Sequence, residues 1–132
     1  QSPLDIVPVQ MTDPEAVAAF FGPKLRHLTK EVFIVCFLNN QKQMIDFKQI
    51  NSGGSRATVV EPAEVMRLSI LHHAQSIIVL HNHPSGNIRA SHADIQLTKR
   101  IQEAGTMLGV PLDDHIIIAS YDYVSMRSEG LV

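Results

Sequence analysis

The sequence has little or none of several features that mark whole classes of protein. It has one cysteine, Cys36, so no disulfide can form within the chain, which fits a reducing compartment, and we expect the cytoplasm. No apolar run approaches the roughly 20 residues that a membrane-spanning helix needs, and residues 1–10 lack the pattern of a secretory signal. We therefore expect neither a membrane protein nor a disulfide-stabilised one.

The chain also has no large excess of positive or of negative charge. Of the 132 residues, 18% are charged and 45% are hydrophobic, and the formal net charge is -2. Such a chain lacks the broad positive field of a nucleic-acid-binding domain. One basic cluster, residues 23–30, is interpreted as a solvated helix face, with a weak nucleic-acid contact as the alternative. We expect one domain, residues 1–132, that is a piece of a longer protein.

The strands are predicted from short continuous apolar runs. Runs with no polar alternation are typical of strands that are buried on both faces, and they lie at 32–38, 77–80 and 115–120. Residues 43–50 alternate weakly and predict a hairpin partner for the first run. After a turn at 121–123, residues 124–126 predict a short last strand, while 51–56 read as a loop.

Three helices are predicted between these runs. The first lies within residues 11–27, where Thr12 and Glu15 form a capping-box pattern and Pro14 suits the first helical position. Gly22-Pro23 is expected to break or kink it. The other two are predicted at 61–74 and 91–108. Buried strands alternating with helices predict an α/β fold, a mixed central sheet flanked by helices.

Two histidines follow the second apolar run. Residues i and i+2 of a strand point to the same side, so His81 and His83 are able to face one point. Two neutral imidazoles suit zinc, and a third oxygen ligand would leave one position open for water. Asp94 supplies that oxygen if residues 84–90 fold the start of the helix back over the end of the strand.

Simpler interpretations exist for each of these residues. Histidines near the end of a strand are often solvated, or hydrogen-bonded within the core. Ser91 and Asp94 also match a capping box at the start of a helix. Taken one at a time, the structural interpretation is favoured for each residue. Taken together, they fit a ligand set on a strand–loop–helix scaffold.

The segment "HNHPSGNIRASHAD" resembles the JAMM (JAB/MPN) metal motif, and with "ADIQLT" and "LDDHIII" it is similar to the RadC-like JAB domains in particular. The resemblance runs from about Glu31 to the end of the chain. It implies the MPN/JAB layered sandwich, which is similar to that of cytidine deaminases. Residues 1–30 would be an N-terminal helix region and 31–132 the metal-binding core. Longer members carry a further N-terminal helix-hairpin-helix region.

The resemblance also implies roles for individual residues. It makes His81, His83 and Asp94 zinc ligands and Ser91 the donor to an oxyanion. It makes Glu31 the catalytic carboxylate. Glu61 and Glu64 are rivals for that last role, because periodicity alone does not say which carboxylate faces the metal.

Two departures from the family pattern stand out. Ala90 replaces the proline that commonly precedes the motif serine, and residues 50–60 lack the usual Gly-Thr. Several other side chains are given structural interpretations. These are His72 and His73 near a helix end, His92 facing solvent, Cys36 in the core and Gly86 in the turn. Ser85 is a weak candidate for substrate contact. His115 is expected in a structural hydrogen bond, with a role behind the metal ligands as the less favoured alternative.

Three functions follow from these observations. The first is a zinc-dependent metallohydrolase that cleaves a peptide, isopeptide or other amide bond in an unknown peptide or protein substrate. The alternative is a DNA repair or recombination accessory domain with a structural zinc site, its DNA association indirect or through a missing N-terminal region. The third is a non-catalytic scaffold, against which the complete ligand set argues. No membrane contact is expected, and the oligomeric state stays open.

Overall fold

Five strands form one mixed sheet in residues 9–50 and 60–132, the part of the chain that the computed structural model describes. The strands are β1 (Phe33–Leu38), β2 (Met44–Ile50), β3 (Ser76–Asn82), β4 (Leu112–Ala119) and β5 (Asp122–Ser125). Their order in the sheet is β2-β1-β3-β4-β5. The central pair β3–β4 is parallel and the other neighbours are antiparallel. The predicted α/β class with a mixed sheet is confirmed.

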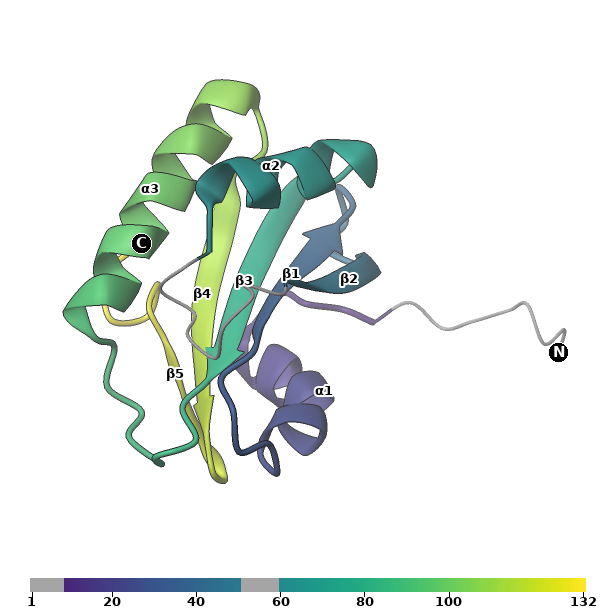
Figure 1. Cartoon of the computed structure of the whole chain (residues 1–132). Coiled ribbons are helices and arrows are strands. Elements are labelled where there is room, and N and C mark those ends of the chain that lie inside the picture. Colours follow the sequence, from purple (N-terminus) through teal and green to yellow (C-terminus); the bar gives the residue numbers. More distant parts are fainter. Residues whose placement is uncertain (1–8, 51–59) are drawn as a thin grey trace, which may run out of the picture.

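Helices cover both faces of this sheet. They are α1 (Pro14–Leu25), α2 (Pro62–Leu71) and α3 (His92–Leu108). Figure 1 shows α2 and α3 together on one face and α1 on the other. Within the described residues, no helix combines the length and the apolar character that crossing a bilayer requires.

The continuous apolar runs are explained by this layering. In β1, Phe33, Val35 and Phe37 pack on the side of α2 and α3, and the residues between them pack on the side of α1. Cys36 belongs to the second set and is fully buried. Burial, with a smaller contribution from the charge of Asp46, raises the pKa of its thiol to about 12. The thiol therefore stays protonated at neutral pH, as expected of a core residue.

The start and end of α1 differ from the prediction. The helix is capped by Asp13, whose side chain accepts a hydrogen bond from the Ala16 amide at 2.8 Å, and not by Thr12. The helix also continues through Gly22-Pro23 to Leu25. A proline this close to the end of a helix costs one backbone hydrogen bond. The burial of Phe21 and Leu25 against the sheet holds the last turn.

Several further boundaries differ from the prediction. Strand β4 runs from Leu112 to Ala119 and not over 115–120, and β3 extends to Asn82 and not only to residue 80. Helix α2 ends at Leu71 and not at 74, because His72 is its C-cap and His73 has a φ of 55°. His72 does serve the helix end, since its Nδ1 donates to the Leu68 carbonyl at 2.8 Å. Strand β5 begins at Asp122, so the turn occupies residues 120–121 only. The predicted loop at 51–56 lies outside the described residues.

Gly105 lies where the end of α3 meets the chain that returns toward β4. A Cβ atom at this position would lie 2.2 Å from the Val110 carbonyl oxygen, which is backbone and has little freedom to move. We expect Gly105→Ala to lower the free energy of unfolding by about 1–3 kcal/mol, the usual effect of overpacking. Urea unfolding measures it, with the exposed Thr106→Ala as the control. Equal stability of the two variants would contradict the close packing.

Candidate metal centre

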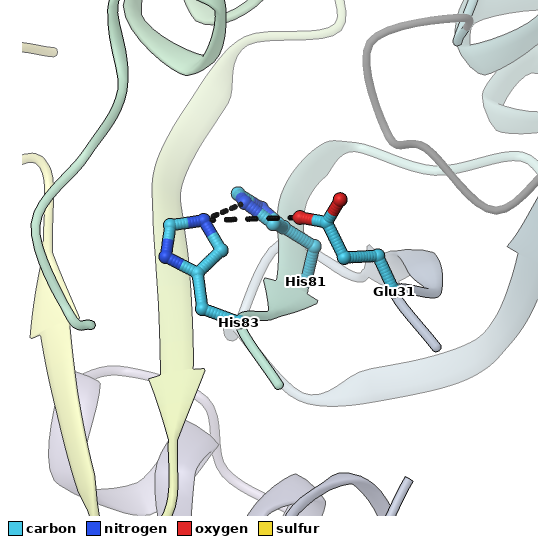
Figure 2. Close-up of side chains that lie close together, drawn as sticks. All are labelled: Glu31, His81 and His83. Carbon is cyan, nitrogen blue, oxygen red and sulfur yellow. Dashed lines mark hydrogen bonds and ion pairs between the residues drawn. The ribbon is translucent and has the colours of Figure 1, made fainter. Parts of the chain in front are cut away.

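The two histidines of the motif lie side by side at the end of β3. In that strand His81 shares a face with Val79, on the side that α3 covers, and it is fully buried. His83 follows the strand directly. Its Nε2 lies 2.9 Å from the Nε2 of His81. Figure 2 shows the two rings facing each other, joined by a dashed line. The i, i+2 spacing thus brings the two ring nitrogens to one point.

Asp94 completes this group from the first turn of α3. Its Oδ1 lies 3.2 Å from His81 Nε2, and its Oδ2 lies 3.2 Å from His83 Nε2. The connecting loop turns at Gly86, whose φ of 87° favours glycine and whose amide donates to the His83 carbonyl at 3.0 Å. The start of the helix is thereby folded back over the end of the strand.

The position of the proton on the neutral His83 ring leaves Nε2 as an electron-pair donor. Its Nδ1 lies 2.6 Å from the Asn87 carbonyl oxygen, which only accepts hydrogen bonds. The proton of the neutral ring is therefore on Nδ1, and Nε2 directs a lone pair toward His81 and Asp94. Lone pairs and a carboxylate at this separation repel one another unless a cation lies between them.

A proton on a histidine Nε2 is one such cation, and the pKa values of the group reflect the hydrogen bond that the protonated ring makes with Asp94. Burial would raise the pKa of Asp94, but hydrogen bonding to His81 and His83 outweighs it and holds that pKa well below its usual range. The hydrogen bond with Asp94 is the main reason that the pKa of His83 is raised. Atoms that bind zinc at 2.0–2.2 Å in a tetrahedron lie about 3.3–3.6 Å apart. The two nitrogens and the carboxylate are zinc ligands in kind, and at 2.9 and 3.2 Å their atoms lie slightly closer together than they would around a tetrahedral zinc ion.

Glu31 lies at the edge of this group, two residues before β1. Its Oε1 is 3.9 Å from His83 Nε2, and one ligand atom each from Glu31, His81 and His83 lies within 4.8 Å of the others (Figure 2). Glu31 is therefore farther from the histidines than Asp94 is. That distance is too long for a direct hydrogen bond. Glu31 therefore faces this group without a hydrogen bond to His83.

Asn82 holds the backbone on both sides of Glu31 and was missed in the sequence. Its Oδ1 accepts from the Val32 amide at 2.7 Å, and its Nδ2 donates to the Lys30 carbonyl at 3.0 Å. The side chain is buried on the face opposite the histidines. The available signal was a polar residue directly after a continuous apolar run, residues 77–80, and between the two histidines. The end of β3 thus carries His81 and, through Asn82, fixes the backbone position of Glu31.

Ser91 and Asp94 form the capping box that the simpler interpretation expects. The Ser91 Oγ accepts from the Asp94 amide at 3.0 Å, and the Ser91 amide donates to Asp94 Oδ2 at 2.9 Å. The same carboxylate also reaches both histidines, so capping and clustering occur together. Because the Ser91 oxygen accepts the amide proton, its own hydroxyl proton is available to donate elsewhere.

A cavity of about 480 Å³ opens beside these residues. Its lining consists of Glu31, His83, Pro84, Ser85, Asn87, Arg89, Ala90, Ser91 and Asp94. Arg89 brings a positive charge that the sequence gave no reason to single out. Glu61 is exposed at the start of α2, and Glu64 pairs with Arg67. Neither rival carboxylate lines this cavity.

His115 lies directly behind His81 and is fully buried. Its Nε2 is 2.8 Å from His81 Nδ1, and its Nδ1 is 2.5 Å from the Thr98 hydroxyl. Burial, and next the proximity of His81, holds the pKa of His115 well below its usual value. Thr98 was not predicted to take part, because only the packing of α3 on β4 brings it to His115. His92, the other histidine near the motif, is exposed as expected.

Comparison with known proteins gives a consistent result. Residues 11–131 match the family model described as the RadC-like JAB domain. A UPF0758 protein of Salinibacter ruber is 43% identical over 124 residues, which are 94% of this chain and 53% of that protein. A UPF0758 protein of Staphylococcus carnosus is 43% identical over 122 residues, 92% of this chain and 54% of that protein. One from Methanosarcina acetivorans is 37% identical over 123 residues, with 93% and 54% covered. The chain spans about half the length of these relatives.

Proposed function

This chain belongs to the RadC-like JAB domain family, and from that premise we propose that it is a zinc-dependent hydrolase of the JAMM type. In this proposal it cleaves a peptide, isopeptide or other amide bond. The observation that carries the proposal is the convergence of His81, His83 and Asp94 at one point beside an open cavity. A purely structural metal site is usually closed by a fourth protein ligand, whereas a catalytic one keeps a position open.

His81, His83 and Asp94 would hold the zinc ion. When bound, zinc supplies Lewis acidity, which lowers the pKa of a water molecule to about 7 and polarises a carbonyl group. Glu31 then acts as the general base, taking a proton from water and later giving it to the leaving amine. Asn82 supports this role because it fixes the backbone on both sides of Glu31.

Ser91 would stabilise the oxyanion that forms when the amide carbonyl is attacked. Its hydroxyl proton is free because its oxygen already accepts from the Asp94 amide. The serine also lines the cavity in which the substrate carbonyl would lie. A donor in this position is commonly worth about 3–4 kcal/mol of transition-state stabilisation.

The alternative of a DNA repair accessory domain has less support among the described residues. The formal net charge is -2, and most of the basic cluster at 23–30 is exposed without forming part of the cavity. Binding through phosphates would weaken steeply as salt is added. A salt titration of DNA binding therefore tests this alternative.

We place the hydrolase in the cytoplasm, since its buried Cys36 needs no oxidising compartment.

Metal content and cleavage measured on one sample test the proposed function. We expect about one zinc per chain by elemental analysis, as one tetrahedral site requires. We also expect hydrolysis in a screen of peptide and isopeptide substrates. Chelation removes the activity and added zinc restores it, because the ligands stay in place. Folded protein that takes up no zinc under these conditions would contradict the proposal.

A further inference from the structure

A buried chain of hydrogen bonds runs behind the metal centre, through three elements of the fold. It starts at His81 Nδ1 on β3 and passes to His115 Nε2 on β4 at 2.8 Å. It continues from His115 Nδ1 to the Thr98 hydroxyl on α3 at 2.5 Å, and ends at the Asp94 backbone carbonyl at 2.6 Å. The side chains of His81, His115 and Thr98 are fully buried. The chain therefore joins two candidate ligands without reaching solvent.

The end at Asp94 fixes the direction of these bonds. A backbone carbonyl only accepts, so the Thr98 hydroxyl donates its single proton to it. The Met126 sulfur, a second contact of this hydroxyl at 3.5 Å, is a weak acceptor and does not compete well. Thr98 Oγ1 has then no proton left for His115. It must accept, and His115 Nδ1 must donate.

The same logic carries the direction on to His81. The polar contacts of the His115 ring are another imidazole and a hydroxyl, and a ring so fully buried is neutral. With its proton on Nδ1, its Nε2 has a lone pair and accepts from His81 Nδ1. A neutral His81 that donates from Nδ1 has no proton on Nε2. That bare nitrogen is the one that faces His83 and Asp94.

We propose that His115 and Thr98 are positioning residues that set the tautomer of His81, so that its Nε2 is ready for a metal before any metal binds. On the open side of the site, the Asn87 carbonyl sets the tautomer of His83 in the same way, because it accepts the proton of His83 Nδ1. The inference about the tautomer stands on the hydrogen-bond chain alone. Its consequence for zinc affinity rests on the proposed function.

A variant that removes one hydroxyl tests this role. Thr98→Val keeps the shape of the side chain but takes away the acceptor for His115 Nδ1–H. His115 then gains by moving its proton to Nε2, which forces His81 to carry its own proton on the nitrogen meant for the metal. We expect zinc affinity, measured by competition with a chromophoric chelator, to fall about 10–100-fold. Thr98→Ser keeps the hydroxyl and is expected to bind zinc like the unaltered chain.

A matched pair at His115 tests the other link. His115→Gln offers one acceptor and one donor at a spacing similar to that of the two ring nitrogens, whereas His115→Leu offers neither. We expect the glutamine variant to retain more zinc affinity than the leucine variant. A role in packing alone would not produce this order, because leucine fills an apolar site better than glutamine does.

The tautomer itself is measured on metal-free protein. The ¹⁵N shifts of the imidazoles at mildly alkaline pH are expected to place the proton of His81 on Nδ1. In Thr98→Val we expect them to show a population with the proton on Nε2. An Nε2 proton on His81 in the unaltered chain would overturn the inference, and so would a Thr98→Val variant with unchanged tautomer and zinc affinity. The first measurement needs neither a folded variant nor zinc. Failure to bind zinc with the expected tautomer would therefore count against the proposed function alone.

Discussion

Asp94→Asn is expected to release zinc from the protein and to abolish hydrolysis. Both carboxylate oxygens of Asp94 face histidine nitrogens, at 3.2 Å each. The asparagine side chain would therefore turn its NH₂ group toward one of the two nitrogens that are proposed to bind zinc. The change also removes the only full negative charge among the three ligands. Loss of a residue that only hydrogen-bonds a metal ligand usually lowers the affinity by about 10–100-fold, and we expect the loss of Asp94 to lower zinc affinity by more than that. Competition with a chelator measures the affinity, and a peptide-cleavage assay measures the activity.

The capping box needs a separate control, because Asp94 also caps α3. In chelator, Asp94→Asn is expected to melt somewhat below the unaltered chain, since the Ser91 amide loses a charged acceptor. The diagnostic quantity is the rise in Tm on adding zinc, which mass action produces only in a chain that binds the metal. His92→Ala, an exposed change in the same helical turn, is expected to keep the full rise. An equal rise in Asp94→Asn would mean that its carboxylate serves the helix alone.

Local patterns in the sequence were sufficient for the sheet and for part of the site. The three continuous apolar runs became central strands because α1 on one face and α2 with α3 on the other bury both sets of side chains. The spacing of His81 and His83 predicted a shared face because a strand has a period of two. Both conclusions depend on residues that are close in the sequence, where geometry leaves few choices.

Contacts between distant segments were beyond the reach of the sequence pattern. The register of the parallel pair β3–β4 sets Val79 opposite His115, and this brings the His115 ring behind His81. Nothing local to residue 115 predicts that register. Thr98 and Asn82 were missed for the same reason, since their partners lie 17 and about 50 residues away. A polar residue in a buried run was the available signal, and it marks a need for a partner without naming one.

Glu31→Gln is expected to separate metal binding from chemistry. Its carboxylate oxygen lies 3.9 Å from His83 Nε2, compared with 3.2 Å for the Asp94 oxygen, and the proposed function makes Glu31 the base and Asp94 the ligand. The glutamine is nearly isosteric but does not take up a proton. We expect zinc affinity to change little and turnover to fall by about 10²–10⁴-fold, the usual contribution of a general acid–base group.

Glu64→Gln and Glu61→Gln are the matched controls for this carboxylate. Both make the same chemical change on α2, where Glu64 pairs with Arg67 and Glu61 is exposed, and neither residue lines the cavity. Turnover in both variants is expected to match that of the unaltered chain. Loss of zinc in Glu31→Gln would make Glu31 a ligand and require a different base. Full turnover in Glu31→Gln together with its loss in Glu61→Gln or Glu64→Gln would give the catalytic role to helix α2, because only a carboxylate that reaches the reacting water carries the proton.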